Sequence, residues 1–280
     1  MASGFDPLSP EERTALLAKP RPRSLPVAPA APPSPRRLPL AGEVRAIDRE
    51  CRPIYAVWEI TLRCDLACRH CGSRAGHARS EELGTEECLD LVDQMAALGV
   101  REVTLIGGEA YLRDDWTEIV RALARHGISV TMTTGGRGID EQRARAAKEA
   151  GIDSVSVSLD GLERTHDRLR GVAGSFRAAV AALGHLRSAG VAVSVNTQIN
   201  RLSMPELPAL LELIGELRAH SWQIQLTVPM GRGADEPDVL LQPYDLLELF
   251  PLLGRLKERA DALGVRIWPG NNVGFFGPYE

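Results

Sequence analysis

The sequence predicts an α/β fold built from parallel β-α-β units, and two regularities support this prediction. From Ile54 onward, short runs of β-branched and other apolar residues alternate with longer segments that have a helical pattern. A glycine lies just past five of the helical segments, where a left-handed residue commonly ends a helix. Strand and helix alternating with this regularity are typical of right-handed parallel β-α-β units around one core.

Six strands and six helices are expected, in alternation. The predicted strands are Ile54–Leu62, Glu102–Ile106, Ser129–Thr133, Ser154–Leu159, Ala192–Ile199 and Trp222–Val228. The predicted helices are Thr85–Leu98, Trp116–His126, Glu141–Ala150, Phe176–Ala189, Met204–Leu217 and Pro243–Leu263. The helix-ending glycines are Gly99, Gly127, Gly151, Gly190 and Gly264. Six units are too few for a closed barrel of eight strands, although 280 residues suit one domain of that size class.

The two ends of the chain differ from the middle. Residues 1–50 include Pro20–Pro39, which is so rich in Pro, Arg and Ala that we expect it to be extended or disordered. We interpret this segment as a linker in preference to a docking arm for a partner. Residues 51–264 form the predicted barrel domain. Residues 265–280 are expected to begin a C-terminal extension, with Val265–Trp268 leaving the barrel.

Bulk composition excludes several classes of protein. The net charge of −4 gives no basic field for nucleic acid. No apolar run is long enough to span a bilayer or to serve as the core of a signal peptide. Unpaired thiols also favour a reducing compartment, so we expect a cytoplasmic protein that binds no membrane.

Three closely spaced cysteines follow the first predicted strand. Cys64, Cys68 and Cys71 have the spacing C-x3-C-x2-C. Three thiolates can hold one inorganic cluster while leaving one iron without a protein ligand, and an open coordination site is where chemistry happens. A disulfide framework is disfavoured by the chain length and by the odd total of five cysteines. A zinc site completed by His70 or His77 is the more serious alternative, although structural zinc sites usually draw ligand pairs from separated segments.

Two further motifs close apolar strands. Gly107-Gly108-Glu109 follows the second predicted strand, and Ser158-Leu159-Asp160-Gly161 ends the fourth. Each motif alone is a weak signal, because glycine pairs and Asp-Gly are also ordinary turn sequences. In parallel α/β folds, however, functional groups gather at the carboxyl ends of the strands. We therefore expect these motifs and the cysteines to share one site.

Taken in this order, the three motifs resemble the signature of the radical S-adenosylmethionine (SAM) superfamily over about Pro53–Gly270. The resemblance implies an open partial (β/α)6 barrel of the TIM type, with parallel strands. It implies that the three cysteines ligate a [4Fe-4S] cluster whose fourth iron chelates SAM. It further implies that SAM is cleaved to a 5′-deoxyadenosyl radical, which abstracts hydrogen from a substrate.

The resemblance also assigns roles around SAM. Gly107 and Gly108 are expected to let the backbone approach the methionine amino group, and the Glu109 carboxylate suits an ammonium partner. Ser158 and Asp160 are expected to contact the ribose hydroxyls or the SAM carboxylate.

Four further residues are candidates for contacts with a cofactor or substrate. His70 occupies the position of an aromatic residue that flanks adenine in the family, and the alternative is an exposed loop residue. Arg170, in preference to Arg168, is expected to reach the SAM carboxylate. Asn196 and Gln198 alternate with apolar neighbours on the fifth predicted strand, which suggests a cofactor or substrate contact for this pair.

The segments Trp58–Cys64, Ser158–Gly161 and His166–Gly171 resemble the branch that modifies ribosomally made peptides and carries a cysteine-rich SPASM or twitch extension. Because no cysteine follows Cys88, we expect a truncated core or a form that lost this extension. Cys88 itself is expected to be a small buried hydrophobe. A peptide is thus the predicted substrate, and an electron donor such as flavodoxin or ferredoxin is the predicted partner. The alternatives are a radical SAM enzyme of small-molecule cofactor biosynthesis and a non-catalytic metal-binding scaffold.

Overall fold

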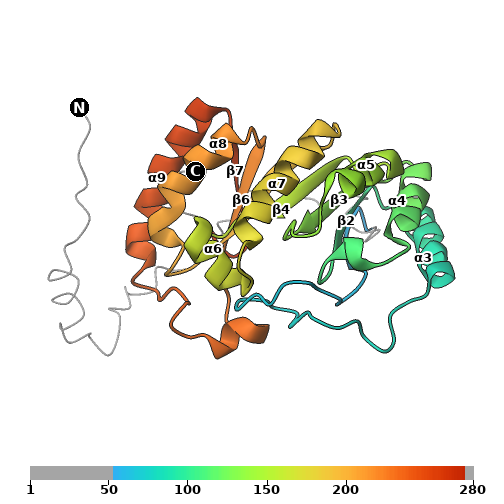
Figure 1. Ribbon diagram of the computed structural model, residues 1–280, viewed down its shortest axis with the longest axis horizontal. Coiled ribbons are helices and arrows are strands. Elements are labelled where there is room, and N and C mark those ends of the chain that lie inside the picture. The colour runs from blue at the N-terminus through green and yellow to red at the C-terminus, as the bar shows by residue number, and fades with distance from the viewer. Residues whose placement is uncertain (1–52, 275–280) are drawn as a thin grey trace, which may run out of the picture. The chain divides into compact units, whose positions relative to one another are not determined.

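Seven parallel strands form one curled sheet in the computed structural model, which describes residues 53–274 (Figure 1). The strands follow chain order, and each pairs in parallel with its neighbours. Their bounds are β1 Tyr55–Glu59, β2 Glu102–Ile106, β3 Ser129–Thr134, β4 Ser154–Ser158, β5 Ala192–Ile199, β6 Ser221–Leu226 and β7 Arg266–Pro269. The expected partial barrel of the TIM type is therefore confirmed.

Helices connect the strands and cover the outer face of the sheet (Figure 1). The α-helices are α3 Thr85–Leu98, α4 Trp116–Arg125, α5 Glu141–Ala150, α6 Glu163–Arg170, α7 Ser175–Ser188, α8 Leu207–Glu216 and α9 Leu246–Leu263. Short 3-10 helices are η1 Ala110–Leu112, η2 Met204–Glu206 and η3 Gly231–Asp235. The five glycines expected past helix ends all have positive φ, between 71° and 107°, a region that favours glycine.

Two elements differ from the sequence-based expectations. Val265–Trp268, expected to leave the barrel, instead contributes to β7, which pairs with β6 from Ser221 to Ile224 and extends the sheet. The six-unit barrel thus gains a seventh strand, and the sheet does not end at residue 264. Helix α6 was not expected, because only Leu169 among its buried residues is a large apolar side chain.

The hydrophobic core lies between the sheet and the helices. Alternate strand residues such as Leu105, Met132 and Trp222 have no exposed surface and pack against the helical layer. Residues on the opposite face are mostly hydroxyl or amide side chains, and they line two neighbouring cavities of about 440 Å³ and 370 Å³; examples are Thr104, Thr131, Ser156, Ser194, Asn196 and Gln223. Because a closed barrel fills this space with bulky apolar residues, the polar inner face marks this half-barrel as a space for a ligand.

The expected disorder of Pro20–Pro39 concerns residues outside the described range. Within residues 53–274, no helix has both the length and the apolar character needed to cross a bilayer. Cys88 is buried in the hydrophobic core, as expected.

Trp222 is expected to be a stability determinant, because it links β6 to β5 and to the residue that follows β4. Its Nε1 donates to Thr197 Oγ1 at 2.8 Å, and that hydroxyl donates to the Leu159 carbonyl at 2.6 Å. Trp222→Phe should lower the free energy of unfolding by about 1–2 kcal/mol, and Trp222→Ala by about 3–5 kcal/mol. Urea unfolding of the apoprotein measures both. The control is Trp268→Phe on the exposed side of β7, and an equal loss in Trp268→Phe and Trp222→Phe would contradict the prediction.

Candidate functional site

The three clustered cysteines lie on a loop that follows β1 and line the larger cavity at the carboxyl edge of the sheet. Cys68 is buried, whereas Cys64 and Cys71 are half-buried. The same cavity is lined by Gly107, Gly108 and Glu109 after β2, by Ser158 at the end of β4 and by Asn196 on β5. The structure therefore brings together the sequence motifs that were expected to share one site.

Gly107 and Gly108 are required by close packing against the cysteine loop. A Cβ on Gly107 would overlap the carbonyl oxygen of Thr61, and a Cβ on Gly108 would overlap that of Arg63. The backbone N–H of Gly108 donates to Thr61 O at 2.8 Å, and that of Glu109 donates to Arg63 O at 2.8 Å. The glycines thus let two backbones meet, and the expected approach of a ligand to them stays a prediction.

Glu109 is a buried carboxylate at the floor of this cavity. It accepts hydrogen bonds from Thr134 Oγ1 and, at 2.7 Å, from the backbone N–H of Gly135. Burial raises the pKa of Glu109 to about 7, although these two hydrogen bonds oppose the shift. A cation that enters the cavity would therefore meet a carboxylate that ionises readily near neutral pH.

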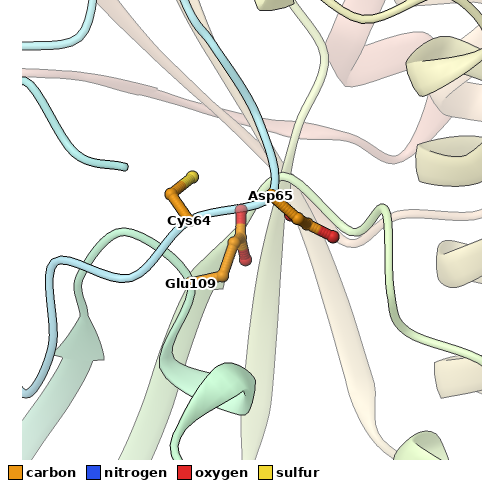
Figure 2. Close-up of side chains that lie close together, drawn as sticks. All are labelled: Cys64, Asp65 and Glu109. Carbon is orange, nitrogen blue, oxygen red and sulfur yellow. The ribbon is translucent and has the colours of Figure 1, made fainter. Parts of the chain in front are cut away.

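Cys64, Asp65 and Glu109 are close enough to share a metal ion, and theirs is the single such group within residues 53–274 (Figure 2). Figure 2 shows the Asp65 carboxylate turned away from the Cys64 sulfur. Asp65 instead accepts from the Tyr111 hydroxyl at 3.1 Å and faces Arg137. No histidine belongs to this group. His77 is exposed and His70 pairs with Asp160, so the described residues do not favour the alternative of a zinc site completed by either histidine.

Asp160 lies behind the cavity, where it joins three elements. It has no exposed surface, and its Oδ2 lies 2.5 Å from an Arg170 guanidinium nitrogen and 3.0 Å from His70 Nε2. Its Oδ1 accepts from the Gln198 backbone N–H at 2.9 Å. Burial alone would raise the pKa of Asp160, but Arg170 and His70 hold it well below its usual range. Both oxygens are thus engaged by protein, in contrast to the ribose or carboxylate contact that we expected.

Arg170 connects this carboxylate to a cysteine. Its Nη1 lies 3.6 Å from Cys68 Sγ. Burial opposes the charge of Arg170, but the neighbouring Asp160 raises its pKa overall. Arg168, the less favoured candidate, is exposed, so the choice of Arg170 is consistent with its position in the site.

The C-terminal end of α6 supports the cysteine loop directly. The carbonyls of Leu169 and Arg170 accept from the backbone N–H groups of Arg69 at 2.8 Å and Ala67 at 3.1 Å. Gly171 ends the helix with φ of 70°, and a Cβ there would lie 2.5 Å from Ala67 O. The short helix that the sequence did not predict therefore has a clear structural role.

The sulfur environment fits a bound metal cluster. Backbone N–H groups of Leu66 and Ala75 lie 3.4 Å from Cys64 Sγ and Cys71 Sγ, and such donors stabilise thiolates. Burial raises the pKa of Cys64 to about 12 and also raises that of Cys68, although Arg170 opposes the latter shift. The two thiols are therefore protonated near neutral pH until a metal displaces their protons.

Sequence reasoning missed Arg232, which lines the same cavity from the 3-10 helix η3. It also missed Thr134 and Gly135, the partners of Glu109. A single arginine between two glycines carries no recognisable spacing. Its position after the sixth strand was the available signal, because the other site motifs also follow strands.

The sequence matches a family model and several curated proteins. The family model of the radical SAM superfamily matches residues 58–214. Fe-coproporphyrin III synthase of Methanosarcina barkeri is 33% identical over 196 residues, which are 70% of this chain and 49% of that protein. A mycofactocin maturase of Mycobacterium ulcerans is 37% identical over 186 residues, which are 65% of this chain and 50% of that protein. The chain thus spans about half the length of these curated relatives.

The fold is also similar to solved structures. Streptococcus suis SuiB bound to S-adenosylmethionine has a TM-score of 0.67 at 17% identity, covering 78% of this chain and 51% of SuiB. At this identity the likeness concerns the fold alone.

Asp160→Asn should strongly destabilise the apoprotein, because it leaves the buried Arg170 charge without a counter-ion. Removing one partner of a buried pair typically costs about 3–5 kcal/mol, and we expect about 3 kcal/mol here from urea unfolding. The matched control is Glu163→Gln, which breaks an exposed pair with Arg177 and should change stability by less than about 0.5 kcal/mol. Equal effects of the two substitutions would show that the Asp160 pair does not stabilise the fold.

Glu109→Gln should change the pH dependence of apoprotein stability. Between about pH 4.5 and 7 the folded chain keeps a proton on Glu109 that the unfolded chain releases, so the contribution of Glu109 to stability falls as the pH rises. A neutral glutamine does not titrate. The free energy of unfolding of the variant, relative to that of the wild type, should rise by about 1–3 kcal/mol from pH 5 to pH 8.

The measurement for Glu109 is a series of urea unfolding curves across this pH range. Glu118→Gln, at an exposed position on α4, is the control and should give a difference that is flat with pH. A flat difference for Glu109→Gln as well would contradict the raised pKa.

Proposed function

Because this chain belongs to the radical SAM superfamily, we propose that Cys64, Cys68 and Cys71 hold a [4Fe-4S] cluster and that SAM binds beside it in the larger cavity. The observation that carries this proposal is the meeting of the three thiols with Gly107–Glu109, Ser158 and Asn196 around one cavity. When bound, the cluster and SAM supply a 5′-deoxyadenosyl radical that abstracts hydrogen from carbon. The remaining task of the chain is to bind, orient and shield the reactants.

The cysteines have to lose their protons to bind iron. Arg170 helps, because its buried guanidinium lies beside Cys68 Sγ and favours the thiolate. Asp160 keeps Arg170 in place from the other side. We therefore assign Asp160 a positioning role in place of a direct contact with SAM.

Glu109 is the candidate partner for the SAM ammonium group. Its carboxylate is already oriented by Thr134 and Gly135, so it needs little rearrangement to accept a cation. Binding an ammonium there favours the ionised carboxylate, so uptake of SAM should release a proton where Glu109 is protonated.

Ser158 and Asn196 are candidates for polar contacts with the ribose or carboxylate of SAM. They are direct partners in the register of β4 and β5, which places them side by side at the carboxyl edge. His70 also lines the cavity and is the candidate for flanking adenine. Its in-plane Nε2 is held by Asp160, which fixes the orientation of the ring.

A ribosomally made peptide is the proposed substrate. The relationship to a mycofactocin maturase supports this choice. The cavities support it as well, because uncharged hydroxyl and amide groups such as those of Thr104, Ser156 and Gln223 suit the N–H and C=O groups of a peptide main chain.

The second candidate is a small-molecule substrate of cofactor biosynthesis, favoured by the relationship to Fe-coproporphyrin III synthase. The product for which this relative is named, an iron coproporphyrin, carries several carboxylates, so a site that forms it calls for cationic partners. The described lining of the two cavities offers Arg170 and Arg232, and both guanidinium groups already contact protein groups. Because the lining offers so few cationic groups for carboxylates, we favour a peptide over a porphyrin as the substrate.

Reduction of the cluster needs an external electron donor, for which a flavodoxin or a ferredoxin is proposed. The proposal also places the protein in the cytoplasm, where such donors and a reducing environment are found.

The test of cofactor binding is anaerobic reconstitution with iron and sulfide. The wild type should take up the iron of one [4Fe-4S] cluster and form 5′-deoxyadenosine from SAM under strong reductant. Replacing Cys64, Cys68 and Cys71 together by Ala should abolish both, whereas Cys88→Ala should leave both unchanged, because Cys88 lies in the core. Full cluster retention in the triple variant, or stoichiometric zinc without iron, would refute the assignment.

The test of substrate class compares two probes on the reconstituted enzyme. A candidate peptide and an iron tetrapyrrole precursor of coproporphyrin are each incubated with SAM and reductant, and products are followed by mass spectrometry. Modification of the peptide alone supports the first proposal. Conversion of the tetrapyrrole alone would replace it by the second.

A further inference from the structure

A segment far away in the sequence packs against the cysteine loop. Residues 230–236 follow β6 and include the 3-10 helix η3. Figure 1 shows this segment beside the loop that follows β1, along the lower edge of the view. More than 150 residues separate the two in the chain, so only the curl of the sheet brings them together. We call residues 230–236 the clamp segment.

Arg232 is the centre of this contact. Its Nε donates to the carbonyl of Cys68 at 2.7 Å, and its Nη1 donates to the carbonyl of Ala75 at 2.9 Å. Its backbone N–H donates to the carbonyl of Cys71 at 2.9 Å. One residue thus binds three carbonyls of the loop, two of which belong to cysteines. The planar guanidinium is suited to bridging two acceptors, which a lysine ammonium does less well.

Glycine lets the two backbones approach closely. Gly231 has φ of 57°, and a Cβ there would overlap the carbonyl oxygens of Cys71 and Gly72. On the loop side, a Cβ on Gly72 would lie 2.9 Å from the Met230 methyl group. The two glycines therefore fix how closely the clamp segment approaches the loop. This distance sets which loop carbonyls the Arg232 donors reach.

Two ion pairs flank this centre. Arg69 pairs with Glu236 at partly exposed positions, and Arg74 pairs with Asp235 where both side chains are more than half exposed. Exposed pairs contribute little to stability, so they do not explain the placement of the loop. They provide instead a matched control, since Arg74 joins the same two segments as Arg232.

We propose that Arg232 is a positioning residue that holds Cys68 and Cys71 in the arrangement needed for cluster binding before the cluster arrives. The loop between these cysteines has few hydrogen bonds of its own, such as that from Cys71 N–H to Cys68 O at 3.3 Å. The carbonyls of Cys68 and Cys71 also accept shorter hydrogen bonds from Arg232 of the clamp segment. The claim that this contact assists cluster binding rests on the proposed function. The claim that Arg232 orders the loop does not.

The first test is hydrogen–deuterium exchange of the apoprotein, which needs neither cluster nor SAM. Because hydrogen bonds to a charged donor are among the stronger ones, Arg232→Ala should speed amide exchange in residues 68–75 by about tenfold or more. Exchange in the strands should stay unchanged. Arg74→Ala should match the wild type throughout. Unchanged exchange in residues 68–75 of Arg232→Ala would overturn the proposal, and faster exchange across the whole sheet would do so too, because it would indicate a general folding role.

The second test asks whether the bridging geometry matters. Reconstituted Arg232→Ala should bind less iron than the wild type and show an altered SAM-dependent change in the electron paramagnetic resonance spectrum of the reduced cluster. Added guanidinium at millimolar concentration should restore iron loading in Arg232→Ala, where it can occupy the vacated space. Arg232→Lys keeps the charge but should stay impaired and should not respond to guanidinium.

The two tests separate the two proposals. Normal iron loading and a normal spectrum in Arg232→Ala would overturn the positioning role even if the wild type carries a cluster. Failure of the wild type to bind iron would refute the proposed function, while faster exchange in residues 68–75 of the Arg232→Ala apoprotein would still show that Arg232 orders the loop.

Discussion

The cysteine loop has to be held in place without a helix or strand of its own, and much of the site follows from this constraint. Each backbone N–H and C=O that leaves water needs a partner. Three segments at the carboxyl edge supply partners: Gly107–Glu109 after β2, the end of α6, and the clamp segment after β6. Each of the three uses a glycine at its closest approach to the loop. The conformation of the loop therefore depends on all three segments together. Their positions depend in turn on the register of the strands that they follow.

Asp160 adds an electrostatic constraint to this backbone network. A carboxylate with no exposed surface is costly to bury, and a buried ion pair is weak evidence for added stability because desolvation offsets the attraction. What the pair does provide is a fixed orientation of the side chains that contact it. Through Arg170 and His70 it fixes two side chains that belong to α6 and to the cysteine loop, while Gln198 fixes the carboxylate to β5. The charge next to Cys68 is thus set by groups that are already in place before any ligand binds.

The parts of the structure that could be predicted from sequence are those with a repeating physical signal. β-Branched runs located the six expected strands, and positive-φ glycines located helix ends, because both reflect local chemistry. Helix α6 could not be found in this way, since the residues that it buries are mostly polar, and Thr165 and Arg170 among them pair with residues outside the helix. The edge strand β7 has only four residues and ends in proline, so its pairing with β6 leaves little trace in the sequence. Arg232 was missed because its partners are backbone carbonyls, which carry no sequence signal.

The polar inner face of the half-barrel follows from where the hydrophobic stabilisation lies. Side chains such as Leu105, Met132 and Trp222 bury their surface against the helices, so the sheet does not need an apolar interior to be stable. Inner residues such as Thr131, Ser194 and Gln223 are therefore not constrained by core packing, and their side chains can suit a ligand. Substitutions among small polar residues at these positions cost little folding energy, because they neither open core cavities nor bury unpaired charge. One scaffold of this kind can therefore keep its fold while its inner face changes, because the groups that stabilise the sheet and those that face the cavities are different residues.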